Sequence, residues 1–109
     1  MQMIVYAGGA FLTGDEIAAA LLEYSRALGE EDTAQIVEIP IVDEDGSRAT
    51  ARFLIGPASQ IVTKSVRSAS EELVDAEVVH RLRMLARGVS FPEAAPLDAR
   101  DDRSEDDDI

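Results

Sequence analysis

The residue best suited to acid-base chemistry is His80, the only histidine among 109 residues. A single histidine excludes a metal site built on several imidazoles, and catalysis would need a carboxylate or hydroxyl group that the fold brings close. Arg83 and Arg87 follow at positions i+3 and i+7, which places the three side chains together on the polar side of a predicted helix. We therefore interpret His80 as a solvated surface residue.

Two other segments contain residue types found in catalytic or calcium sites. Ser59 lies in the sequence GPASQ, which lacks the G-x-S-x-G pattern of a serine nucleophile. The acidic turn Asp43-Glu44-Asp45 lacks the spacing and the closing glutamate of a calcium-binding loop. The sequence therefore predicts no catalytic, cofactor-binding or metal-binding residue, and we expect a protein that is not an enzyme.

One alternative is small-molecule binding or a minor enzyme activity at the corner formed by Gly8 to Glu16. Gly8-Gly9 precedes a predicted helix start at Thr13, and backbone N–H groups at such a start favour anions. However, the lysine of a phosphate loop is absent, and Asp15 and Glu16 would repel phosphate. A plain turn from strand to helix is the better interpretation.

The strongest structural signal is a β-hairpin from Ala34 to Gly56. Alternation places Val37, Ile39 and Ile41 on one face of its first strand, and Ala49, Ala51, Phe53 and Ile55 share a face of its second strand. The turn DEDGS contains an Asp-Gly step suited to a tight reversal. Pro40 lacks an N–H, which predicts an edge or an unpaired side of the backbone there.

Two amphipathic helices are predicted to cover this hairpin. The first begins with a capping box of Thr13 and Glu16, ends at about Leu28 before Gly29, and presents a stripe of Ile17, Leu21, Tyr24 and Leu28. The second runs from about 76 to 87 after the N-cap Asp75, with Val78, Leu82 and Leu85 as its stripe.

Two further strands complete the predicted fold, one over residues 1–7 and one over 60–66 with Val62 and Val66 facing the core. The sequence thus predicts a small two-layer α+β domain over residues 1–90, with element order β-α-β-β-β-α and two helices on one face of a mostly antiparallel sheet. Residues 91–109 lose apolar periodicity, and we expect a disordered acidic tail. Strand order and the structure of residues 67–74 stay open.

Composition excludes several classes of partner. The formal net charge is −12, which disfavours nucleic acid and anionic lipid. The sequence has no cysteine and no apolar run of membrane-spanning length, so we expect a cytoplasmic protein without disulfides. Arginine supplies nine of the ten basic residues, which indicates a GC-rich bacterial genome.

The leading hypothesis is a non-enzymatic protein-interaction or regulatory module, binding a protein partner or forming a homodimer through the outer hairpin face or the edge at Pro40. An acidic inhibitor or immunity-type protein for a basic enzyme is the alternative. The candidate partner-binding residues are one leucine off the stripe of the first helix and four residues of the outer hairpin face: Leu22, Glu38, Arg48, Arg52 and Leu54.

Overall fold

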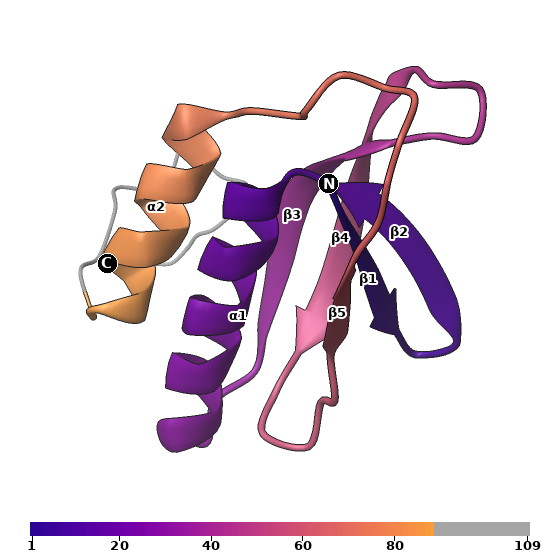
Figure 1. Ribbon diagram of the computed structural model, residues 1–109. Helices are drawn as coiled ribbons and strands as arrows, with labels where there is room; N and C mark the ends of the chain where they lie inside the picture. The colour runs from indigo at the N-terminus through magenta and orange to yellow at the C-terminus, as the bar shows by residue number, and fades with distance from the viewer. Residues whose placement is uncertain (89–109) are drawn as a thin grey trace, which may run out of the picture.

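The computed structural model describes residues 1–88, which form five strands and two helices (Figure 1). The elements are β1 (Gln2–Tyr6), β2 (Gly9–Thr13), α1 (Asp15–Glu30), β3 (Gln35–Val42), β4 (Arg48–Ile55), β5 (Val62–Ser65) and α2 (Ala76–Ala86). The α+β class and the antiparallel sheet are confirmed. The expected acidic tail at 91–109 lies outside the described residues.

The predicted hairpin is confirmed as β3 and β4. Val37 pairs with Phe53, Ile39 with Ala51 and Ile41 with Ala49, so the two predicted apolar sets share one face. Gly46 closes the turn at φ +86°, a conformation that glycine adopts at little cost.

The sheet contains one strand more than the sequence predicted. Strand structure does not stop at Gly8-Gly9, because the chain reverses there and a second strand follows. Ala7 and Gly8 form a two-residue turn with φ values of +53° and +82°, the sign that a type I′ hairpin turn requires at both central positions. The chain therefore returns as β2, pairing Tyr6 with Gly9 and Gln2 with Thr13.

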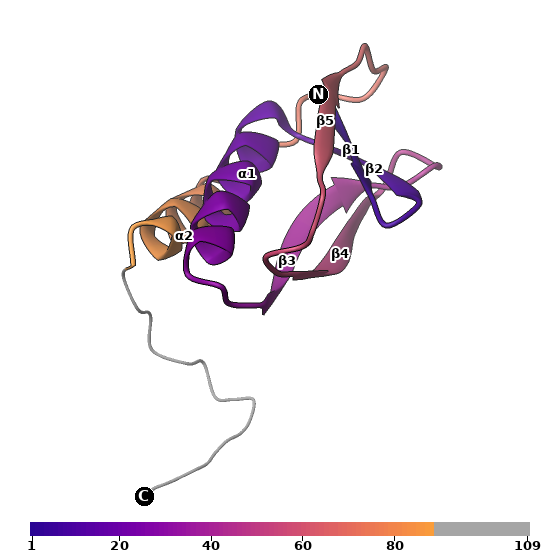
Figure 2. The same cartoon turned by 90° about the horizontal axis from the view of Figure 1, so that it is seen from below.

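The strand order is β4-β3-β2-β1-β5, with every pair antiparallel. β4 and β5 are the two edge strands, and the sheet is strongly curled, since a side chain of β1 reaches the backbone of β4. Figure 2 shows that β1, β2 and β5 form one part of the sheet and β3 and β4 the other, and that the two parts are set at an angle around α1. The Tyr6 hydroxyl donates to the backbone carbonyl of Leu54 across this curl, and the rings of Tyr6 and Phe53 meet edge to face at 5.7 Å.

This strand order shows that one predicted detail of the sheet is wrong, and it decides between the two alternatives for Pro40. β5 pairs with β1, and Val62 is 59% exposed, so its side chain does not face the core as expected. β3 is an interior strand, so the expected edge at Pro40 does not exist. The unpaired backbone that proline implies is found instead, because β2 and β3 pair only at Leu12 and Val42.

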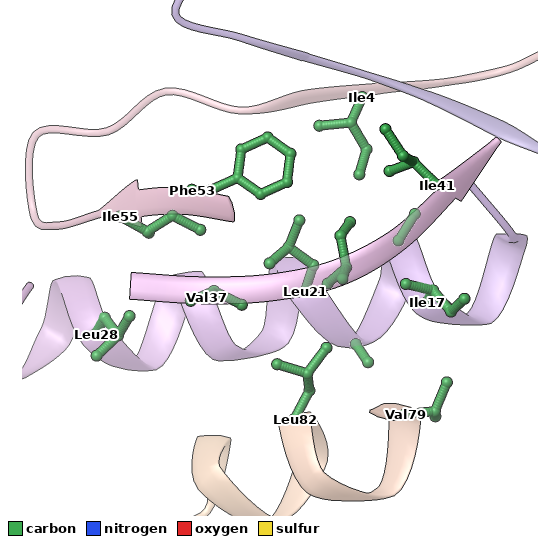
Figure 3. Packing of buried hydrophobic residues seen from close by; sticks show 13 residues of the cluster. Ile4, Ile17, Leu21, Leu28, Val37, Ile41, Phe53, Ile55, Val79 and Leu82 are labelled. Atoms are coloured by element: carbon green, nitrogen blue, oxygen red, sulfur yellow. The ribbon is translucent and has the colours of Figure 1, made fainter. Parts of the chain in front are cut away.

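The core lies between the concave face of the sheet and α1 (Figure 3). Ile17, Leu21 and Leu28 of the predicted stripe are almost fully buried, and Tyr24 packs against the same cluster at partial burial. They meet Ile4 and the inward side chains of β3 and β4. Burying an aliphatic side chain of this size stabilises the fold by about 1.5–3 kcal/mol.

Helix α2 lies on the same side of the sheet as α1 but packs chiefly against α1 (Figures 1 and 2). Its N-cap is Asp75, as predicted, and the Asp75 carboxylate accepts a hydrogen bond from the N–H of Val78 at 3.2 Å. Val79 and Leu82 are the buried residues, whereas Leu85 of the predicted stripe is half-buried.

The predicted capping box at the start of α1 is wrong. Thr13 is the last residue of β2, and its buried hydroxyl donates to the carbonyl oxygen of Pro40 at 2.8 Å. Gly14 is the N-cap, with no side-chain cap of its own. The first N–H of α1, on Asp15, instead donates to the Glu72 carboxylate at 2.6 Å, so a distant segment caps the helix.

The predicted end of α1 is also wrong, because the helix passes through Gly29 and ends at Glu30. Asp32 adopts the left-handed conformation at φ +55°, and the N–H of Thr33 reaches back to the carbonyl of Leu28 at 3.0 Å. These contacts define a Schellman motif in which Asp32 occupies the position that glycine usually takes.

Candidate functional site

The convex side of the sheet, which we call the outer face, is the most distinctive surface of the described residues. Neither helix covers it, since both lie on the concave side (Figure 2). Alternation with the buried residues assigns to it the following side chains: Met3, Val5, Ala10, Leu12, Ile36, Glu38, Pro40, Val42, Arg48, Thr50, Arg52, Leu54, Val62 and Lys64.

One row of residues crosses all five strands of the outer face in register. Arg48 pairs with Val42, Val42 with Leu12, Leu12 with Met3, and Met3 with Lys64. The row therefore has three half-buried apolar side chains in its centre and an exposed basic side chain at each end. With strands about 4.8 Å apart, the row follows a path of about 19 Å along the curled sheet, so the straight-line distance between its two ends is shorter.

The outer face differs in charge from the rest of the protein. Its side chains include three basic residues and one acidic residue, whereas the whole chain has a net charge of −12. Two of the three basic residues are ion-paired, Arg48 with Asp75 and Arg52 with Glu38. All three basic residues lie on the edge strands β4 and β5, so the charge forms a rim around an apolar centre. Among residues 1–88, no carboxylate lies within ion-pair distance of Lys64.

Four of the five predicted partner-binding residues lie on this face. Arg52 donates to the Glu38 carboxylate at 2.6 Å, which makes them a cross-strand ion pair. Next to it, Leu54 is 65% exposed and pairs with Ile36, which is 67% exposed. Arg48 bonds the N-cap residue Asp75 at 2.6 Å, so its guanidinium is held at the β4 edge and links the sheet to α2.

Leu22, the fifth predicted residue, belongs to a different surface. It lies on α1, is 36% exposed, and lines a shallow pocket of about 290 Å³ whose other side is formed by Ile55, Gly56, Pro57, Ser59 and Ile61. The structure therefore does not bring Leu22 together with the other four residues.

A cleft of about 900 Å³ separates the start of α1 from α2. Asp15, Glu16 and Glu72 line one side, and His80 and Arg87 line the other. Arg83 crosses from α2 to α1, where it bonds Glu23 at 3.2 Å and approaches Glu16 at 3.8 Å. The acidic groups are thus largely paired, and no cluster of three or more potential metal ligands occurs within residues 1–88.

The α-amino group of Met1 joins this cleft to the sheet. It lies 3.0 Å from both the Asp15 and the Glu72 carboxylate. The hydrogen bond that the amine donates to Glu72, followed by the one that it donates to Asp15, raises the pKa of the amine above its ordinary value. The same contact with the amine, together with Gln2, lowers the pKa of Asp15. These contacts hold residues 66–75 against the start of α1, so we assign them a structural role.

The corner from Gly8 to Glu16 is not a single site in the structure. Gly8 belongs to the β1–β2 turn, whereas Asp15 and Glu16 lie beyond the other end of β2 and line the cleft. The first N–H of α1 is occupied by Glu72, which removes the free donor on which anion binding was based.

Several outer-face residues were not predicted. Met3, Val5 and Leu12 required the β1–β2 hairpin, whose turn begins with an alanine at positive φ. Lys64 and Val62 required the pairing of β5 with β1. The alternation within MQMIVYA was a usable signal for Met3 and Val5, but strand order has no comparable local signal.

Comparison of the chain with protein-family models, with curated proteins and with solved structures found no match in any of the three. No helix of residues 1–88 is both long enough and apolar enough to cross a membrane.

Proposed function

We propose that this protein is a non-enzymatic protein-interaction module that binds a partner protein through its outer face. The observation that carries the proposal is an uncovered sheet face with an apolar centre and a charged rim. This distribution is typical of protein interfaces, in which a desolvated apolar core is surrounded by polar residues. The exposed pair of Ile36 and Leu54 forms a second apolar patch on the same face, beyond the Glu38–Arg52 ion pair.

The test compares capture of proteins from a cytoplasmic lysate of the source cells by three forms of the full chain. The parent chain is expected to retain a stoichiometric partner, and the double variant Ile36→Ser, Leu54→Ser is expected to lose it. Val74→Ser is the matched control, because Val74 is 70% exposed but lies outside the sheet. A partner retained by the double variant would show that the outer face is not the contact surface.

A second candidate is an acidic inhibitor or immunity-type protein for a basic enzyme, favoured by the net charge of −12. Its contact surface would be acidic and would exclude the outer face. This candidate predicts a basic partner that is released at high salt and retained by the Ile36→Ser, Leu54→Ser variant. Binding that is indifferent to salt would remove its basis.

A further inference from the structure

We propose that the cleft between α1 and α2 is an internal docking site for the chain that follows Gly88, with the side chain of Phe91 placed on Met84 and Val79. The inference goes beyond the proposed function, because the cleft lies on the helical side of the molecule and not on the outer face. Three features support it: the lining of the cleft, the direction in which the chain leaves α2, and the distance that the next residues can reach.

The cleft follows one side of α2 over its whole length. Its acidic residues, Asp15, Glu16 and Glu72, lie at the start of α1, where the Met1 amine and Arg83 neutralise them. The end beside the last turn of α2 therefore accepts an apolar side chain without placing a carboxylate against it. From α2 the cleft takes residues that recur every three or four positions: Ala76, Val79, His80, Arg83, Met84 and Arg87.

The carboxyl end of α2 directs the chain towards the cleft. Gly88 adopts φ +84°, and its N–H donates to the carbonyl of Leu85 at 3.0 Å. This is the arrangement of the C′ residue in a Schellman motif, the motif that also ends α1. The residue after C′ frequently packs its side chain on position C3 of the helix, and these two residues are Val89 and Met84. Since Met84 lines the cleft, the motif favours a return of the chain along it.

The next three residues have the length and the conformational preference to bring Phe91 to the cleft. Phe91 precedes Pro92, and the residue before a proline favours an extended conformation. In an extended chain Val89 and Phe91 point to the same side. Three residues span at most about 11 Å, which is the length of about two turns of α2. A chain that returns along α2 therefore brings Phe91 within reach of Met84 and Val79.

Phe91 is the one aromatic residue of the chain beyond residues 1–88. The other four belong to the hydrophobic core or pack against it: Tyr6, Phe11, Tyr24 and Phe53. Because Phe91 is only the third residue after Gly88, its effective concentration at the cleft is high and docking orders little additional chain. A second copy of the chain or a free ligand would bind without this advantage.

The proposal departs at one point from the expected tail at 91–109, since it adds Phe91 to the folded domain. The acidic residues from Asp98 onward are not part of it. It also gives the cleft an occupant from the chain itself, so a small molecule would have to displace Phe91 in order to bind there.

The first experiment looks for the contact in the full chain by NMR. NOEs are expected from the ring protons of Phe91 to the ε-methyl group of Met84 and to the methyl groups of Val79. In a mixture of labelled and unlabelled chains, a filtered NOE spectrum separates contacts within one chain from contacts between two chains. Absence of these NOEs would overturn the proposal. NOEs found only between chains would also overturn it and would identify a second copy as the occupant.

A matched pair of substitutions measures the contribution of Phe91. Phe91→Ala is expected to lower the Tm of the full chain by about 4–8 °C, a shift typical of one lost apolar contact in a domain of this size, and to move the Met84 ε-methyl resonance. Leu97→Ala is the control, because Leu97 is an apolar residue further along the same segment, and neither change is expected from it. Equal shifts with both variants, or an unchanged Met84 resonance in Phe91→Ala, would refute the proposed contact.

The two proposals are tested separately. Phe91→Ala changes no residue of the outer face, and the Ile36→Ser, Leu54→Ser variant changes no residue that lines the cleft. A missing Phe91 contact therefore removes this inference alone, whereas a cellular partner retained by the double variant removes the proposed function alone.

Discussion

The most informative single substitution is Gly14→Ala at the N-cap of α1. Gly14 has φ −76°, so alanine meets no backbone restriction there. The obstacle is space, because a Cβ atom would lie 1.8 Å from the carbonyl oxygen of Leu73 and 3.1 Å from a Glu72 carboxylate oxygen. The Leu73 carbonyl must therefore retreat by more than about 1 Å, which pulls Glu72 away from the N–H of Asp15.

The expected cost combines two effects. Overpacking costs about 1–3 kcal/mol, and losing the hydrogen bond that caps a helix start costs about 0.5–2 kcal/mol. A total near 2–4 kcal/mol is a large part of the roughly 5–10 kcal/mol expected for a domain of this size. With a slope of about 2 kcal/mol per molar urea, the middle of the typical range, the unfolding midpoint should fall by about 1–2 M.

The control for this measurement is Gly29→Ala. Gly29 lies in the last turn of α1, its φ is not positive, and nothing lies within 4 Å of the added Cβ. Alanine there should stabilise the protein by about 0.5–1 kcal/mol, because glycine is a poor helix former. A Gly14→Ala variant as stable as the parent would refute the close contact between residues 72–73 and the start of α1.

Four other predictions concern stability and use urea or thermal unfolding. Asp32→Gly should stabilise the protein by about 0.5–1 kcal/mol, since glycine relieves the left-handed position at φ +55°, and a loss of stability would contradict the Schellman assignment. Asp75→Ala should cost about 1 kcal/mol while Asp75→Asn should cost less, because asparagine keeps the N-cap and loses only the ion pair with Arg48; equal losses would show that the cap contributes nothing. Because the pKa of the Met1 amine is raised, the stabilisation that the charged amine gives to the folded state is present below about pH 8 and is lost as pH rises through the higher folded-state pKa. Glu72→Gln should therefore make the loss of stability at alkaline pH smaller. The lowered pKa of Asp15 has the opposite sign, so its contribution is present above about pH 4 and is lost on further acidification.

Features that depend on nearby residues were predicted well. The β3–β4 hairpin follows from alternation and an Asp-Gly turn, and α2 follows from Asp75 and an apolar stripe. In these segments the local preference and the tertiary structure favour the same conformation, which is the usual condition for a foldable sequence.

Features that depend on distant residues were missed. The start of α1 is capped by Glu72, which is 57 residues away in sequence, so the local Thr13-x-x-Glu16 pattern had no role in it. Ala7 adopts a positive φ that its sequence position gives no reason to expect, and the loss of β2 from the predicted fold followed from that one residue. The side of β5 that faces the core was misassigned because its partner is β1 and not β4.

The outer face combines both kinds of information, which explains why only part of it was predicted. Glu38, Arg52 and Leu54 come from one hairpin and were found by alternation alone. The apolar centre comes from β1 and β2, and its register with β3 depends on the single pair of Leu12 and Val42. Because a basic residue then follows on each edge strand, the strand order, and not any contiguous motif, places basic residues at both edges of this face.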